Sequence, residues 1–184
     1  MDLRITKTYL ALTKAFQELL EEKLFEDITV NELCKRAMIR RATFYKHFAD
    51  KYDFFAFMVR DIQEKHNENR NSVEGFINMK DELLDIVKYA LDYVEGNKRL
   101  VRSILKSSAL DVLLNILSEQ ISIDVLFKFR QAKRNGIELP TNPEIMAQIF
   151  TGSLIQILRW WIIQKDPIDK DTLVDNLSKV IEKF

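Results

Sequence analysis

The most informative side chains of this sequence are six cations that lie within residues 35–51. The stretch contains a single anion, Asp50, and its cations are Lys35, Arg36, Arg40, Arg41, Lys46 and Lys51. Closely spaced lysine and arginine residues neutralise the phosphates of nucleic acid, and arginine also reads guanine edges. A charge cluster on a helix is often only a solvated face. The elements that carry the cluster therefore decide between the two interpretations.

The residues that usually perform catalysis are sparse. The two histidines, His47 and His66, lie apart in the sequence, and neither has a neighbouring cysteine or paired carboxylate. Cys34 falls on an apolar helical stripe, which favours a buried structural thiol over a nucleophile. The sequence has no phosphate-binding glycine loop, metal-ligand spacing or nucleophile elbow. We therefore expect no enzymatic activity, no metal site and no cofactor.

The cations lie on a pattern that is typical of two short helices joined by a tight turn. Thr29 and Glu32 have the spacing of a capping box at the start of the first helix. The second helix is expected over residues 41–48, with Phe44 and Phe48 on its buried face. Such a helix-turn-helix can place its basic second helix in the major groove of DNA.

The outward side chains of this motif are candidates for DNA contact. Tyr45 and Lys51 are placed to anchor phosphates at the helix boundary, while Thr29 and Arg36 could touch the DNA backbone from the preceding helix. The candidates for base edges and nearby phosphates are Arg40, Arg41, Thr43, Lys46 and His47.

The string A-M-I-R-R-A-T-F-Y-K-H-F-A-D-K resembles the DNA-binding motif of the TetR/AcrR family of transcriptional regulators. Met38 differs, because the family usually has glycine there, and a side chain penalises a left-handed backbone. We therefore expect a slightly different turn. Arg40 stands where the family usually has a capping serine, so we expect a less ordered helix start. The matching residues are Ala37, Ile39, Thr43, Phe44, Tyr45, His47, Phe48 and Lys51.

The resemblance implies a fold, a partner and a mode of action. The fold would be an N-terminal three-helix domain with the helix-turn-helix, followed by a helical domain for dimerisation and effector binding. The partner would be double-stranded DNA with a palindromic operator, bound by a homodimer whose recognition helices lie about one DNA turn apart (~34 Å) or somewhat more. The expected function is repression of a nearby promoter, released by a small-molecule effector, with activation as the alternative.

Composition predicts an all-α protein with about nine helices. The 184 residues include only four glycines and three prolines, which favours short loops. We divide the chain into a DNA-binding domain (1–50), a connecting helix (51–71) and a larger helical domain (72–184). The single cysteine excludes an intramolecular disulfide. The N-terminus carries no apolar signal segment, and the most hydrophobic stretch is too short to span a bilayer. We expect a cytoplasmic protein.

One helix of the larger domain, expected over residues 142–165, is apolar nearly all round. Such a helix is buried on more than one side, and a second copy of the chain covers the extra side most easily. Gly152 and Ser153 would let a neighbouring helix approach closely. An ordinary monomer core is the alternative. The predicted dimer seam consists of Phe150, Gly152, Ser153, Leu154, Ile157, Trp161, Leu173, Leu177 and Val180.

The resemblance also implies an effector pocket in the larger domain. Aromatic and soft side chains are candidates for its lining, with plain core packing as the alternative for each. Those candidates are Phe76, Met79, Tyr89, Tyr93, Phe127, Phe129 and Trp160.

Two other functions stay open. An architectural DNA binder would have no effector and many genomic sites, which genome-wide occupancy would reveal. A co-regulator whose C-terminal body binds a protein partner would yield one stoichiometric partner in a pull-down.

Overall fold

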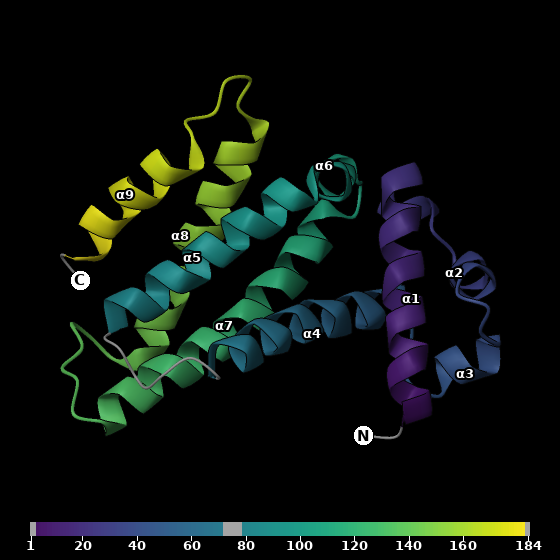
Figure 1. Cartoon of the computed structure of the whole chain (residues 1–184), viewed down its shortest axis with the longest axis horizontal. Helices are drawn as coiled ribbons and strands as arrows, with labels where there is room; N and C mark the ends of the chain where they lie inside the picture. Colours follow the sequence, from purple (N-terminus) through teal and green to yellow (C-terminus); the bar gives the residue numbers. More distant parts are fainter. Residues whose placement is uncertain (1–2, 72–78, 183–184) are drawn as a thin grey trace. The chain divides into compact units, whose positions relative to one another are not determined.

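The computed structural model describes residues 3–71 and 79–182, and this part of the chain contains nine α-helices and one short 3-10 helix (Figure 1). The all-α fold expected from the sequence is confirmed. The elements are α1 (Leu3–Glu22), η1 (Phe25–Asp27), α2 (Val30–Arg36), α3 (Arg41–Tyr45), α4 (Lys51–Asn71), α5 (Met79–Gly96), α6 (Lys98–Lys106), α7 (Leu110–Arg134), α8 (Pro143–Ile163) and α9 (Lys170–Ile181).

The chain divides into two compact units. The first comprises residues 1–63 and 97–116, and the second comprises residues 64–96 and 117–184. Two helices, α4 and α7, therefore contribute residues to both units. The domain boundaries that we drew along the linear sequence, at residues 50 and 71, stay a prediction. None of the helices within the described ranges is long and apolar enough to cross a lipid bilayer.

The first unit is built on α1, which packs against α2 and α6 (Figure 1). Its apolar stripe buries Phe16 completely, in edge-to-face contact with Phe25 and Phe54, at ring-centroid distances of 5.9 and 5.4 Å. Phe44 of α3 reaches the same cluster, 6.0 Å from Phe54. Aromatic pairs at such distances stabilise a core beyond their buried area. The cluster therefore fixes α3 to the body of the unit.

The η1 segment is tied to the start of α7 through Glu26. Its carboxylate accepts hydrogen bonds from the hydroxyl of Ser107 and, at 2.8 Å, from the backbone N–H of Ser108. These bonds lower the pKa of Glu26 to about 2. On the other side of the same segment, the hydroxyl of Ser103 in α6 donates to the backbone carbonyl of Lys23 at 2.8 Å. The connection between α1 and α2 is therefore held by α6 and by the two residues that follow α6, Ser107 and Ser108.

We expect the contribution of Glu26 to stability to depend on pH. Its folded pKa lies below the unfolded value of about 4.3, so the carboxylate stabilises the fold above that value and loses this effect as pH falls toward 2. In urea titrations between pH 7 and pH 2, the wild type should be more stable than Glu26→Gln at neutral pH, and the difference should shrink on acidification. A difference that stays constant down to pH 2 would contradict this assignment.

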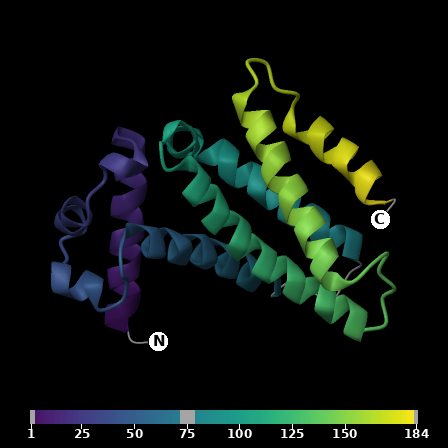
Figure 2. The ribbon, with the colours of Figure 1, turned by 180° about the vertical axis from the view of Figure 1, so that it is seen from behind.

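The second unit contains α5, α8, α9 and most of α7. Figures 1 and 2 show α9 lying along α5, and α8 crossing α5 behind it in Figure 1 and in front of it in Figure 2. Its core includes Leu83, Phe129 and Met146, all at most 6% exposed. The helix α8 starts at Pro143 after the cap residue Asn142, whose side chain accepts from the backbone N–H of Ile145 at 2.8 Å. Proline at the first helical turn and a capping asparagine favour this start.

Candidate nucleic-acid interface

The start of α2 is fixed by the capping box that the sequence predicts. The Thr29 hydroxyl accepts from the backbone N–H of Glu32 at 3.2 Å, and the Glu32 carboxylate accepts from the backbone N–H of Thr29 at 3.1 Å. Lys23 donates to the same carboxylate at 2.6 Å. The hydrogen bond from Lys23 and those from Thr29 together lower the pKa of Glu32 to about 2. The Thr29 side chain is thus exposed but already engaged in the cap.

The turn after α2 takes the left-handed conformation despite the side chain at position 38. Met38 has a φ of 55°, its N–H donates to the Lys35 carbonyl at 3.2 Å, and the Ile39 N–H donates to the Cys34 carbonyl at 2.9 Å. This pair of bonds is a Schellman motif. The expectation of a different turn is therefore wrong. The motif's two hydrogen bonds hold the backbone, and a side chain that is 93% exposed meets no obstruction.

We expect Met38→Gly to stabilise the protein. A left-handed non-glycine residue is strained, and glycine removes that strain at some entropic cost. The net gain in the free energy of unfolding should be about 0.5–1 kcal/mol. Urea unfolding measures it, with Met38→Ala as the matched control because alanine loses the exposed side chain but keeps the Cβ. Equal effects of both substitutions would contradict the role assigned to the backbone.

The recognition helix is shorter than predicted. It spans Arg41–Tyr45, whereas the sequence pattern suggested residues 41–48. Lys46 and His47 form a turn, since the chain must leave the helix to reach the start of α4. There Asp50 caps α4 by accepting from the N–H groups of Tyr52 and Asp53, at 2.8 and 2.9 Å. As expected, the Arg40 side chain makes no cap hydrogen bond at the start of α3.

The exposed side chains around α3 are basic and have no acidic partner within the described part of the chain. Arg40, Arg41 and Lys46 are all exposed. The Arg41 guanidinium lies 5.8 Å from the centre of the Tyr45 ring, and that ring is itself 49% exposed. Thr43 is half-buried beside them. Unpaired cations on a protruding helix are available to phosphates and base edges.

Two other predicted DNA contacts are engaged within the first unit. Arg36 makes a two-pronged ion pair with Glu22 of α1, with both N–O distances at 2.7 Å, and lies 3.7 Å from Glu18. The Nδ1 atom of His47 lies 3.3 Å from the Tyr9 hydroxyl, and the two rings meet edge to face. The Arg36 contact holds α2 against α1, and the His47 contact holds the turn after α3 against α1.

Lys51 occupies a site that sequence reasoning did not foresee. Its ammonium donates to the backbone carbonyls of Phe25, Glu26 and Ile28, at 2.8, 2.9 and 2.9 Å. It also lies 4.8 Å from the centre of the Phe25 ring. Burial lowers the pKa of Lys51. An ammonium has three protons to donate, and all three are used. Its proposed contact with phosphate stays a prediction, while its hold on η1 is a feature of the fold.

Two family models match this chain. Residues 12–58 match the model of the bacterial regulatory proteins of the tetR family, and residues 81–183 match a TetR-type transcriptional regulator C-terminal region. The second match alone covers more than half of the chain. The chain belongs to the TetR family. Its fold and family are those of transcriptional regulators, and the N-terminal match contains the whole helix-turn-helix.

Two HTH-type transcriptional regulators resemble this chain in part. YxbF of Bacillus subtilis (strain 168), an HTH-type transcriptional regulator, is 39% identical over 61 residues. DhaS, the activator of the dhaKLM operon in Lactococcus lactis, is 28% identical over 79 residues. These matches cover 33% and 42% of this chain but only 16% and 40% of the two relatives. The chain therefore matches less than half of the length of each relative.

The fold is shared with solved members of the family. The regulator FadR of Bacillus subtilis, whose structure contains stearoyl-CoA, superposes with a TM-score of 0.66 at 15% sequence identity. The superposition covers 94% of this chain and 97% of FadR. At this level of identity the likeness concerns the TetR fold alone.

The predicted dimer residues of this TetR-family chain are partly buried and partly exposed. Leu154, Trp161 and Leu173 are at most 7% exposed, and the Trp161 indole N–H donates to the Ile168 carbonyl at 2.7 Å. Gly152 faces open space, since a Cβ built there meets nothing within 4 Å. Helical spacing places it on one exposed stripe of α8, whose members are Ile145, Ile149, Gly152, Ser153, Gln156, Trp160 and Ile163.

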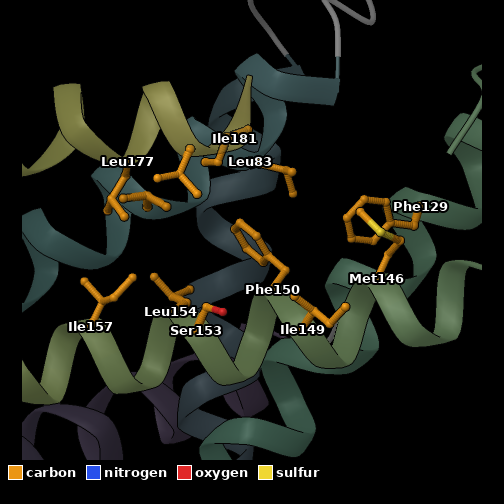
Figure 3. A pocket seen from close by; sticks show the side chains of 12 residues that line it. Leu83, Phe129, Met146, Ile149, Phe150, Ser153, Leu154, Ile157, Leu177 and Ile181 are labelled. Atoms are coloured by element: carbon orange, nitrogen blue, oxygen red, sulfur yellow. The ribbon is translucent and has the colours of Figure 1, made fainter. Parts of the chain in front are cut away.

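The predicted pocket residues do not gather in one place. Tyr89 stacks on the His66 ring at 3.9 Å, Phe127 and Trp160 are 63% and 42% exposed, and Phe76 lies outside the described residues. Met79 packs against the core of the second unit, and Tyr93 is half-buried. A cavity does lie in that unit, among α5, α7, α8 and α9 (Figure 3). Of the predicted pocket residues, its lining includes Phe129 alone, together with six of the predicted dimer residues, namely Phe150, Ser153, Leu154, Ile157, Leu177 and Val180.

Proposed function

We propose that this protein is a homodimeric regulator that binds a palindromic operator through α3 and represses a nearby promoter until an effector binds its second unit. The observation that carries the proposal is the unpaired basic surface of α3, formed by Arg40, Arg41 and Lys46 with Tyr45 beside them. With Lys35, which is also exposed, each protomer offers four cations without an acidic partner among the described residues.

The exposed apolar stripe of α8 supports the dimer. Ile149 and Trp160 are 44% and 42% exposed, and Gly152 lies between them with open space above it. An apolar helix face with a small residue at its centre suits close packing against another helix. A symmetric dimer would present two recognition helices to two half-sites of an operator.

The proposed effector response draws support from relatives. FadR of Bacillus subtilis was solved with stearoyl-CoA, so a protein of this fold accommodates a small molecule. DhaS is an activator, which keeps activation as the alternative outcome of promoter binding. The physical requirement is that the effector binds two arrangements of the dimer with different affinity.

A salt titration tests the DNA-binding proposal. Fluorescence anisotropy with duplexes that include the protein's own upstream region should show binding at low salt. The logarithm of the affinity should fall with the logarithm of salt with a slope near −7, if eight cations of a dimer each neutralise one phosphate. Failure to bind any duplex at about 50 mM salt would overturn the proposal.

The dimer proposal predicts a specific effect of Gly152→Leu. A Cβ at this position meets nothing within 4 Å in its own chain, but the leucine side chain would block a partner helix, so we expect monomers and a loss of operator affinity. Analytical ultracentrifugation measures the association state. Gly96→Leu is the matched control, because a Cβ there also meets nothing within 4 Å. A Gly152→Leu protein that stays dimeric would remove this face from the interface.

A further inference from the structure

We propose that the second unit binds a small, uncharged apolar molecule in the cavity among α5, α7, α8 and α9. The cavity has a volume of about 230 Å³. Figure 3 shows Phe150 pointing from α8 toward Leu83 and Ile181, and Leu177 of α9 facing Leu154 and Ile157 of α8 across the space. Binding in this place is a property of the second unit alone. Its effect on an operator rests on the proposed function.

The cavity reaches from an open mouth to the core. At the mouth, Val180 is 52% exposed, and Ile149, which also belongs to the proposed dimer face, is 44% exposed in the single chain. At the floor, Val87 and Phe129 are 3% and 0% exposed, and Phe129 belongs to the core cluster of the unit. A well-packed interior leaves few voids larger than a water molecule. A space that extends this deep is therefore open to a ligand that enters between α8 and α9.

The lining determines the chemical class of the ligand. Eleven of its twelve residues are apolar, and the only polar side chain is that of Ser153. A charged group inside would lose its hydration without gaining a partner. An apolar cavity also holds no tightly bound water that a ligand must displace. These properties select an uncharged molecule, with any hydroxyl group directed to Ser153 at the mouth.

The volume limits the size of the ligand. A cavity of about 150 Å³ accommodates benzene in another protein, so 230 Å³ corresponds to about nine or ten non-hydrogen atoms. Indole, naphthalene and n-octanol fall in this range. Larger molecules would leave part of their surface outside the mouth, against the exposed side chains of Ile149 and Val180.

Thermal denaturation and calorimetric titration of the full chain test the proposal. Indole, naphthalene and n-octanol serve as probes, and octanoate and naphthalene sulfonate are their charged counterparts. We expect at least one neutral probe to bind saturably and to raise the melting temperature, with at least tenfold weaker binding of its charged counterpart. Absence of saturable binding by all three neutral probes, or preference for the charged compounds, would overturn the proposal.

Two matched variants locate the site. Val87→Phe fills the cavity from α5 and should abolish probe binding. Val94→Phe makes the same change at another buried position of α5, outside the lining, and should leave binding intact. If Val87→Phe does not fold, Leu177→Ala replaces it, and by enlarging the cavity it should strengthen naphthalene binding. Probe binding that none of these lining changes alters would also overturn the proposal.

The association state separates a small molecule from a second copy of the chain as the occupant. If a partner's side chain filled the cavity, Val87→Phe would weaken the dimer and no probe would bind the wild type, which would contradict the proposal. These measurements need no DNA. Failed operator binding therefore leaves the cavity result intact, and failed probe binding leaves the DNA-binding proposal intact.

Discussion

Replacing Arg41 with alanine is expected to lower operator affinity roughly 10- to 100-fold for each half-site, because an arginine that reads a base edge contributes about 1–3 kcal/mol. Arg41 is exposed on α3, has no acidic partner in the described chain, and stacks its guanidinium on the Tyr45 ring at 5.8 Å. The ring orients the side chain before DNA arrives, so little conformational entropy is lost on binding. Loss of affinity should be larger for the cognate operator than for other duplexes.

Lys46→Ala should behave differently from Arg41→Ala. The Lys46 ammonium follows the last residue of α3 and is suited to phosphates, so its loss should weaken binding to all sequences alike. The slope of log affinity against log salt should become smaller by about one per protomer. Anisotropy titrations at several salt concentrations separate the two behaviours. Arg130→Ala is the control, since this exposed arginine belongs to the second unit and pairs with Glu144 at 2.7 Å. Unchanged DNA affinity of both variants would remove these side chains from the interface.

Lys51→Met is expected to destabilise the first unit by about 2–3 kcal/mol, because hydrogen bonds from a charged group to three carbonyls are lost and the methionine stem replaces only the packing. Operator affinity should fall as a consequence, since η1 leads directly into the cap of α2. Lys51→Arg should also be less stable than the wild type, because a planar guanidinium cannot direct its protons to three convergent carbonyls. Urea unfolding measures both variants.

The same two variants separate the structural role of Lys51 from a role as a phosphate anchor. A phosphate anchor would lose DNA affinity in Lys51→Met without a change in the free energy of unfolding, and Lys51→Arg would retain binding. Lys35→Met is a suitable control because Lys35 is exposed and has no acidic partner among the described residues. Unchanged stability of Lys51→Met would therefore favour the phosphate contact and contradict the structural assignment.

Local patterns in the sequence were sufficient for the helices and for the capping box of Thr29 and Glu32, because these features depend on residues three or four positions apart. Arg36 pairs with Glu22, which lies 14 positions away in the sequence. Lys51 donates to carbonyls that lie 23–26 positions away. No local periodicity encodes such contacts, so the sequence predicts DNA contact for these side chains but not their partners within the fold. The length of α3 was overestimated for a related reason. The apolar spacing of Phe44 and Phe48 extends beyond the last helical residue, Tyr45, and Asp50 then caps the start of α4.

Of the residues that line the cavity, the sequence predicts only Phe129 as a pocket residue, because eight of the twelve are aliphatic. The other candidates are mostly aromatic, yet Phe127 and Trp160 are exposed, and Tyr89 stacks on His66. Leucine, isoleucine and valine at helical spacing are identical in sequence whether they fill a core, line a void or meet a partner. Only the packing of α5, α7, α8 and α9 around this space separates these cases, and that packing is a property of the folded structure.

The brevity of α3 limits how much sequence one protomer can distinguish. Five helical residues extend about 7.5 Å, which is little more than two base-pair steps. A DNA sequence of that length recurs by chance at very many places in a bacterial genome, where about 10⁶ or more competing positions exist. In the proposed dimer, selectivity would then arise from two short half-sites at a fixed separation. The rigidity of the second unit would keep that separation constant. It would therefore affect which promoters are bound as strongly as the identity of any base-reading side chain.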